Sequence, residues 1–247
     1  MNVLPLLIVL LTFAIGGCSK PLGEVATASK VAGEAGQRVA QAAEESGDLA
    51  LAEQLYAQAS AAAPSDAAVQ LRYADILMRR GRINEARDLL SKRLQTVSDP
   101  LELHDGLGSV YVLTGDPIHA VTEFDLVLAA KPNDIRAVVN KGIALDLLGR
   151  HTDAQALYRQ ALTLSPGDQV VINDLALSML LAGRPQEAEQ VAAPLRGQTD
   201  VLPRIRTGLG IVLAANGDVA GAGSAAGTQA TQAQLVQLAK AAASSAH

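Results

Sequence analysis

The sequence predicts an all-α fold, a right-handed superhelical solenoid of about six helix–turn–helix units. The first observation is a period of 34 residues: glycine recurs at this spacing from Gly47 to Gly217, and small residues recur in step with it. The second is composition, because 49% of the residues are hydrophobic but only 2% are aromatic, and Trp is absent. Alanine and leucine suit close-packed helices, whereas sheets favour aromatic and β-branched residues. A fixed period of this length indicates an array in which each unit packs on its neighbours.

The first helix of each unit is expected to end at the recurring glycine, because a left-handed conformation costs glycine least. Seven residues before the glycine each unit has Ala or Gly, which would let the second helix cross closely. Five residues after it an alanine is expected to face that crossing. The recurring glycines are Gly47, Gly81, Gly115, Gly149, Gly183 and Gly217.

The second helix of most units carries a large side chain nine residues after the glycine, such as Tyr56 or Tyr158. We expect these side chains to fill the space between one unit and the next. In three units a proline is expected to end the second helix, because proline cannot continue a helix. These prolines are Pro64, Pro132 and Pro166.

Repeats of this length and pattern resemble the tetratricopeptide repeat (TPR), and the resemblance covers roughly residues 33 to 222. We assign residues 31–222 to the TPR array. After Ala222 the sequence GSAAGTQATQAQ contains glycines that weaken helix formation, together with several glutamines. Residues 223–247 are therefore predicted to form a degenerate capping segment with a polar outer face.

The N-terminus carries an uncharged apolar run, VLPLLIVLLTFAI, at residues 3–15. This run is shorter than the roughly 20 residues that a membrane-spanning helix needs, and its length is typical of a signal-peptide core. The residues that follow, Ile15-Gly16-Gly17-Cys18, resemble the bacterial lipobox, whose cysteine takes up a diacylglyceryl group; this cysteine is the only one in the chain. Residues 1–17 are therefore predicted as a lipoprotein signal peptide, and residues 18–30 as the lipidated cysteine and a flexible tether.

The start of this segment departs from the usual pattern, because Met1 and Asn2 supply no Lys or Arg. The alternative is an uncleaved apolar N-terminus with a chance cysteine. Ser19 follows the cysteine where lipoproteins of the inner membrane often have aspartate, so it indicates sorting to the outer membrane.

The sequence predicts no enzyme, no metal site and no cofactor. It has no motif of serine hydrolases, phosphate-binding loops or dinucleotide-binding folds, and no histidine is spaced from another histidine or the cysteine as metal ligands are. The net charge of −5 and the lack of a basic stripe argue against nucleic acid as a partner. No small-molecule substrate is expected either. The histidines are expected on the solvated surface; they are His104, His119, His151 and His247.

The first helices of such an array line a concave surface, which is its usual binding face. The residues expected to point into it are mostly polar in units one to three and become apolar in units four to six. Aliphatic walls with a few polar groups suit an amphipathic helix or an extended apolar peptide. The alternative is that the chain's own tail, around Leu235 and Leu238, covers the groove. The predicted partner-binding groove consists of Val139, Asn140, Ile143, Asp146, Leu147, Asn173, Leu177, Leu180, Leu181 and Ile211.

Three segments resemble the TadD family, which comprises TPR lipoproteins of tight-adherence (Flp) pilus assembly. They are LDLLGRH at residues 145–151, LALSMLLAG at residues 175–183, and the pair Arg204 and Arg206. The resemblance implies a protein lipid-anchored through Cys18 in the bacterial outer membrane and facing the periplasm. Its implied role is that of a pilotin, which binds the pilus secretin and helps it localise or assemble. The alternatives are a pilotin of type IV pili or of a secretion system, and another periplasmic TPR assembly factor for envelope proteins.

Overall fold

The computed structural model describes residues 36–97, 100–198 and 200–226, with four further residues at 234, 236, 237 and 240. In this part of the chain every regular element is a helix, which confirms the predicted all-α fold. Within it, no helix combines the length and hydrophobicity that a bilayer-crossing segment needs. The predicted signal peptide, Cys18 and the tether lie outside the described residues, as do Leu235 and Leu238.

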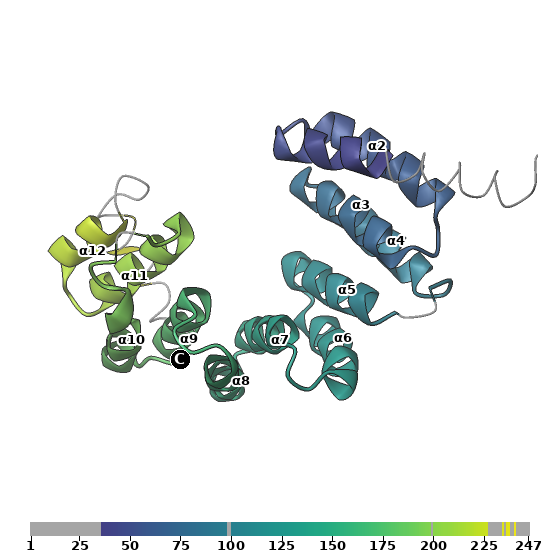
Figure 1. Ribbon diagram of the computed structural model, residues 1–247. Helices are drawn as coiled ribbons and strands as arrows, with labels where there is room; N and C mark the ends of the chain where they lie inside the picture. The colour runs from purple at the N-terminus through teal and green to yellow at the C-terminus, as the bar shows by residue number, and fades with distance from the viewer. Residues whose placement is uncertain are drawn as a thin grey trace, which may run out of the picture.

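The helices follow one another in pairs, one pair for each unit of the sequence period. The first pair is a helix over residues 36–45 and α2 (Leu49–Ala62). The next pairs are α3 (Ala67–Arg79) with α4 (Ile83–Arg93), α5 (Leu101–Thr114) with α6 (Pro117–Ala130), and α7 (Ile135–Leu147) with α8 (His151–Leu164). The last two are α9 (Gln169–Leu181) with α10 (Pro185–Ala192), which continues into the 3₁₀ helix η1 (Ala193–Leu195), and α11 (Pro203–Ala215) with α12 (Val219–Ala226). Figure 1 shows the pairs stacked in chain order along an arch, with α2 and α12 towards opposite ends.

The turns within the pairs have the conformation that the sequence predicts. All six recurring glycines have positive φ angles, between 72° and 85°. After α7, the amide of Gly149 donates to the carbonyl of Asp146 and the amide of Arg150 donates to the carbonyl of Leu145, both at 2.9 Å. These bonds satisfy carbonyls that the end of a helix would otherwise leave unpaired. The turn at Gly149 thereby fixes the direction in which α8 returns along α7.

The connections between pairs also follow the sequence. The second helices α2, α6 and α8 end just before the three predicted prolines. An aspartate two residues after each proline then starts the next first helix, because its carboxylate accepts a hydrogen bond from a backbone amide of that helix. These capping residues are Asp66, Asp134 and Asp168.

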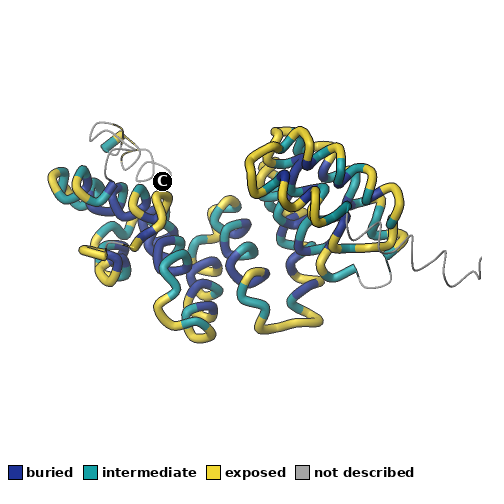
Figure 2. The backbone as a smooth tube through the Cα atoms, turned by 45° about the horizontal axis from the view of Figure 1, so that its top comes forward, coloured by how far each residue is buried: buried dark blue, intermediate teal, exposed yellow. Residues whose placement is uncertain are grey.

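The core lies between successive helices along the array. Its largest cluster of buried residues extends from α7 to α12. Figure 2 shows buried stretches where helices meet and exposed stretches at many of the connecting turns. At the crossings within pairs, Gly108 lies against the ring of Phe124 and Gly142 against the ring of Tyr158. The predicted close crossing at small residues is therefore present in units three and four.

The last helix runs further than the end that we assigned to the array. Helix α12 continues to Ala226, beyond residue 222. Gly221, which weakens helix formation, donates its amide to the carboxylate of Asp218 at 2.8 Å. An added Cβ there would lie 2.3 Å from that carboxylate, so the glycine makes room for the cap. This capping interaction offsets part of the low helix propensity of the segment.

Candidate functional site

A pocket of about 540 Å³ opens between α7, α8 and α9. It lies in units four and five, where the sequence predicts that the groove becomes apolar. Its lining residues are Ile143, Asp146, Leu147, Gly149, His151, Tyr158, Asp174, Leu177, Ser178 and Leu181. We call this site the α7–α9 pocket.

Aliphatic side chains from the two first helices border the pocket. Helix α7 contributes Ile143 and Leu147, and α9 contributes Leu177 and Leu181. The members of each pair are four residues apart, so they lie on the same face of their helix. Leu147 is 54% exposed, whereas Ile143 and Leu177 pack partly against the core. The two pairs therefore offer apolar surface that a partner could cover.

A hydrogen-bonded carboxylate lies beneath this apolar border. Ser178 Oγ donates to Asp146 Oδ1 at 2.7 Å, and the hydroxyl of Tyr158 donates to Asp146 Oδ2 at 3.0 Å. His151 Nδ1 lies 2.8 Å from Asp146 Oδ1. Burial, followed by the charge of Asp146, raises the pKa of Tyr158 well above its usual value, so its hydroxyl remains a donor. The carboxylate thus links α7, α8 and α9 and fixes the spacing of the pocket walls.

The serine, histidine and aspartate of the pocket do not form a catalytic triad. In a triad the histidine accepts the proton of the serine hydroxyl, and the aspartate orients the histidine from its other side. Here Ser178 and His151 both contact the same oxygen of Asp146. The serine hydroxyl is therefore directed at the carboxylate, and this arrangement does not activate it as a nucleophile.

An acid–tyrosine contact of the same kind occurs in the first unit. The hydroxyl of Tyr56 donates to Glu44 Oε2 at 3.4 Å, and both residues occupy the repeat positions that Tyr158 and Asp146 occupy in unit four. In both units a tyrosine of the second helix therefore donates a hydrogen bond to an acidic residue of the first helix. The additional bonds from Ser178 and His151 distinguish the unit-four carboxylate.

Half of the predicted groove lines this pocket. The predicted residues that the structure brings together there are Ile143, Asp146, Leu147, Leu177 and Leu181.

The other predicted groove residues lie elsewhere. Val139, Asn173 and Leu180 are buried, and Leu180 is only 1% exposed, so these three do not form an open wall. Asn140 is half-buried outside the pocket, and Ile211 packs against the core of units four to six. The apolar residues among these do not line the pocket because a first helix packs against other helices on two sides. Part of its apolar surface is therefore buried in the core, and only the rest faces the pocket.

The prediction for the histidines is wrong at two positions. The side chain of His151 is 17% exposed and that of His104, which lies 2.6 Å from Glu123, is 19% exposed. His119 is exposed as expected, and His247 lies outside the described residues.

Five pocket residues were not in the predicted groove: Gly149, His151, Tyr158, Asp174 and Ser178. Ser178 and Asp174 were detectable as polar residues within the largely apolar helix α9. His151 and Tyr158 belong to the second helix of the unit, whereas the predicted groove consists of residues from first helices only. In the part of the chain that the structure describes, no group of His, Cys, Asp or Glu side chains could hold a metal ion.

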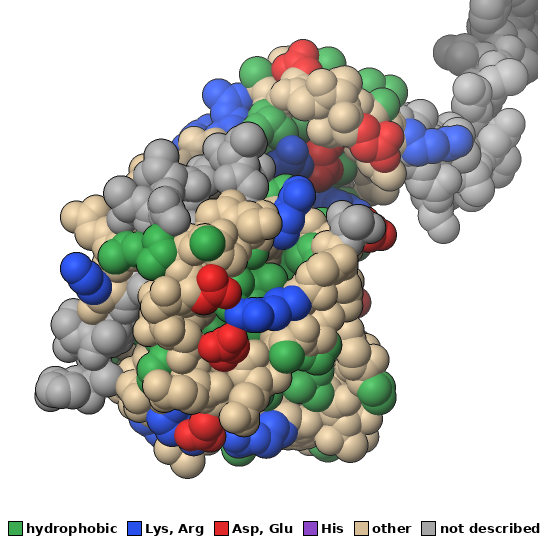
Figure 3. All heavy atoms as spheres, turned by 90° about the vertical axis from the view of Figure 1, so that its left-hand side faces the viewer, with side chains coloured by type: hydrophobic (Ala, Val, Ile, Leu, Met, Phe, Trp, Pro, Cys, Tyr) green, Lys and Arg blue, Asp and Glu red, His purple; other side chains and the backbone are tan. Residues whose placement is uncertain are grey.

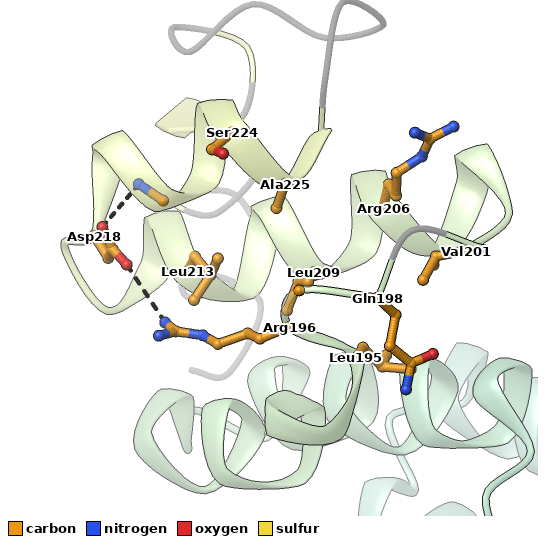
Figure 4. Close-up of a pocket in the computed structure, with 12 residues that line it drawn as sticks. Leu195, Arg196, Gln198, Val201, Arg206, Leu209, Leu213, Asp218, Ser224 and Ala225 are labelled. Carbon is orange, nitrogen blue, oxygen red and sulfur yellow. Dashed lines mark hydrogen bonds and ion pairs between the residues drawn. The ribbon is translucent and has the colours of Figure 1, made fainter.

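A second pocket, of about 430 Å³, lies at the end of the array between the α10–α11 connection, α11 and α12. Figure 4 shows Leu209 and Leu213 within it and Arg196 extended towards Asp218. Arg196 pairs with Asp218 at 3.4 Å and with Glu189 at 2.7 Å, so its charge is already balanced. Figure 3 shows this end of the molecule, where hydrophobic side chains lie in patches and acidic and basic side chains lie next to one another. The α7–α9 pocket has the more extensive exposed aliphatic border and is therefore the stronger candidate.

Comparison with known protein families gives matches to models described as tetratricopeptide repeat. One model matches residues 43–101 and 147–206, and another matches residues 106–169. A curated relative, the uncharacterized protein y4yS of Sinorhizobium fredii (strain NBRC 101917 / NGR234), is 34% identical over 100 residues. That alignment covers 38% of this chain and 55% of the relative, so the chain spans about half the length of the curated relative that it matches.

Solved structures with a similar fold include PilW, described as a widely conserved type IV pilus biogenesis factor. The TM-score is 0.69 at 20% identity, over 78% of this chain and 90% of PilW. MamA of AMB-1 is similar with a TM-score of 0.52 at 25% identity, over 69% of this chain and 96% of MamA. Because PilW and this chain are only 20% identical, their similarity shows a shared fold and nothing more specific.

Proposed function

Since the chain belongs to the tetratricopeptide-repeat family, we propose that it is a non-enzymatic scaffold whose α7–α9 pocket binds a short amphipathic segment of another protein. The observation that carries the proposal is the pair of aliphatic borders, Ile143 with Leu147 and Leu177 with Leu181. Complete burial of such side chains is worth about 1.5–3 kcal/mol each. Part of this gain offsets the loss of freedom on binding. A helix with apolar residues three and four apart would match the borders.

We propose that the partner is the secretin of a tight-adherence pilus, and that the protein acts as its pilotin. Support comes from where the TadD-like segments lie in the fold. The segment 145–151 includes Asp146, Leu147 and His151 of the pocket, and the segment 175–183 includes Leu177 and Ser178. Two of the three sequence features that carry the family resemblance therefore contribute residues to the candidate site, whereas Arg204 and Arg206 do not line it.

A pilotin of type IV pili is the second candidate. The fold shared with PilW over 78% of this chain favours it. Both candidates place the same pocket against an envelope protein, and they differ in the pilus system that the partner belongs to.

A photo-crosslinking amino acid at position 147 tests this proposal in cells that carry a tight-adherence system. We expect a crosslink to the secretin from position 147 and none from position 118, because Ile118 lies on α6 and is 67% exposed outside the pocket. A crosslink to a type IV pilus protein would favour the second candidate. The absence of any crosslink specific to position 147 would contradict binding in the pocket.

We further propose that Cys18 carries the lipid anchor and that the array faces the periplasm from the outer membrane. The Cys18→Ser variant is expected to lose acylation and to leave the membrane fraction or remain unprocessed, because serine lacks the thiol that is modified. Mass spectrometry of the mature N-terminus and membrane fractionation measure this. Ser29→Ala in the tether is the matched control and should remain membrane-bound. An unmodified Cys18 in membrane-extracted native protein would refute the anchor.

A further inference from the structure

The charges of the α7–α9 pocket are unbalanced. Among the described residues that line it, Asp146 and Asp174 are acidic, and none is Lys or Arg. From this imbalance we infer that the segment bound in the pocket carries a Lys or Arg side chain between aliphatic residues, and that Asp174 receives this cation. The inference rests on the proposed function of the pocket as a peptide-binding site and adds the chemistry of the peptide.

The two carboxylates have different roles because their hydrogen bonds differ. Asp146 accepts bonds on both oxygens from residues of the protein, so it is fully engaged. Asp174 receives one bond, from Asn173 Nδ2 to Oδ1, at 3.3 Å. In the described part of the chain, no Lys or Arg lies within ion-pair distance of Asp174. Its second oxygen is therefore available to a donor that enters the pocket.

The position of Asp174 places it beside the aliphatic border. It lies on α9 three residues before Leu177 and four before Ser178, hence on the same face of the helix as these pocket residues. A peptide whose aliphatic side chains cover Leu177 would bring a neighbouring long cationic side chain within reach of Asp174. The aliphatic stem of Lys or Arg can also lie along apolar surface while its charged end reaches the carboxylate.

The environment of Asp174 favours a cationic partner. Burial raises the pKa of Asp174, and the nearby charges of Asp146 and Asp168 act in the same direction. The bond from Asn173 and the charge of Arg204 lower this pKa. Arg204 is exposed on α11 and does not line the pocket. A desolvated carboxylate near other acids gains more from an incoming cation than a fully solvated one does.

Other peptide chemistries fit the pocket less well. A C-terminal carboxylate would be repelled by the two acidic side chains. A wholly apolar segment would remove the second oxygen of Asp174 from water without giving it a donor, and burying a polar atom without a hydrogen bond is costly. The combination of the apolar border and a carboxylate with one oxygen free of protein hydrogen bonds therefore selects an aliphatic segment with a basic residue.

Three synthetic amphipathic peptides test the inference by fluorescence anisotropy with the full chain. Each has four leucines on one helical face, and they differ only in a central residue, which is Lys, Met or Glu. We expect the Lys peptide to bind about tenfold more tightly than the Met peptide, and the Glu peptide to bind most weakly. The Asp174→Asn variant should bind the Lys and Met peptides equally. Its melting temperature should not fall, because the amide removes a desolvated charge.

Asp88→Asn is the matched control, since Asp88 is an exposed acid on α4 outside the pocket, and it should keep the preference for Lys. Leu147→Lys separates this inference from the proposed function. If all three peptides bind equally and Leu147→Lys abolishes their binding, the pocket binds peptides but the cation preference is overturned. If no peptide binds, or if Leu147→Lys leaves binding unchanged, both the inference and the proposed function fail.

Discussion

The Gly142→Leu variant is expected to lose about 3 kcal/mol or more of its unfolding free energy, because it overpacks the close crossing of α7 and α8. A Cβ at position 142 would lie 2.6 Å from Cε1 and 2.9 Å from Cζ of Tyr158. The ring of Tyr158 is 1% exposed, and its hydroxyl is held by Asp146. The ring therefore cannot move aside without losing this hydrogen bond and disturbing the core. Leucine adds three more carbon atoms to the same contact.

Urea unfolding followed by circular dichroism measures this effect. Ala156→Leu is the matched control, because Ala156 lies on the exposed side of α8 and the same side chain should change stability by no more than about 0.5 kcal/mol there. Equal unfolding midpoints for native protein and Gly142→Leu would mean that the two helices do not cross at this residue.

The repeat architecture was predictable because its determinants are local and recur. Glycine at a positive φ angle and proline after a helix each act within a few residues. The glycine recurs in all six units and the proline in three of them. The period placed Gly142 at the crossing within the pair but assigned the facing position to the alanine five residues after Gly149; in the structure the ring of Tyr158, expected between units, also lies against Gly142. The expected close crossing was therefore a consequence of the register of the repeat.

The pocket was harder to predict because some apolar residues of α7 and α9 pack in the core and others line the pocket. Leu180 and Leu181 are adjacent and equally apolar, yet Leu180 is 1% exposed in the core and Leu181 lines the pocket. Hydrophobicity alone cannot separate them, since the rotation of the helix about its axis depends on the neighbouring units. The contact between Asp146 and His151 crosses the turn at Gly149, so it follows neither helical spacing nor the repeat period.

The Leu147→Lys variant is expected to reduce capture of the proposed partner at least about tenfold while leaving the helical fold intact. Leu147 is 54% exposed, so the folded protein can accommodate a charge at this position. The variant removes apolar area from the border of the pocket and adds a positive charge to the pocket that we expect to receive the partner's own cation. Both changes oppose binding, the first through lost burial and the second through repulsion.

Pull-down of the secretin from envelope extracts, together with secretin multimer formation in cells, measures this loss. Ile118→Lys introduces the same charge at an exposed isoleucine of α6 and should leave capture unchanged. If Leu147→Lys has the thermal melt of the native protein and still supports secretin assembly, the pocket does not bind this partner. Truncation after Ala226 then tests whether the chain's own tail occupies the pocket. Removal of residues 227–247 would increase partner capture if the tail competes for the site, because the aliphatic border would become available, and would leave it unchanged otherwise.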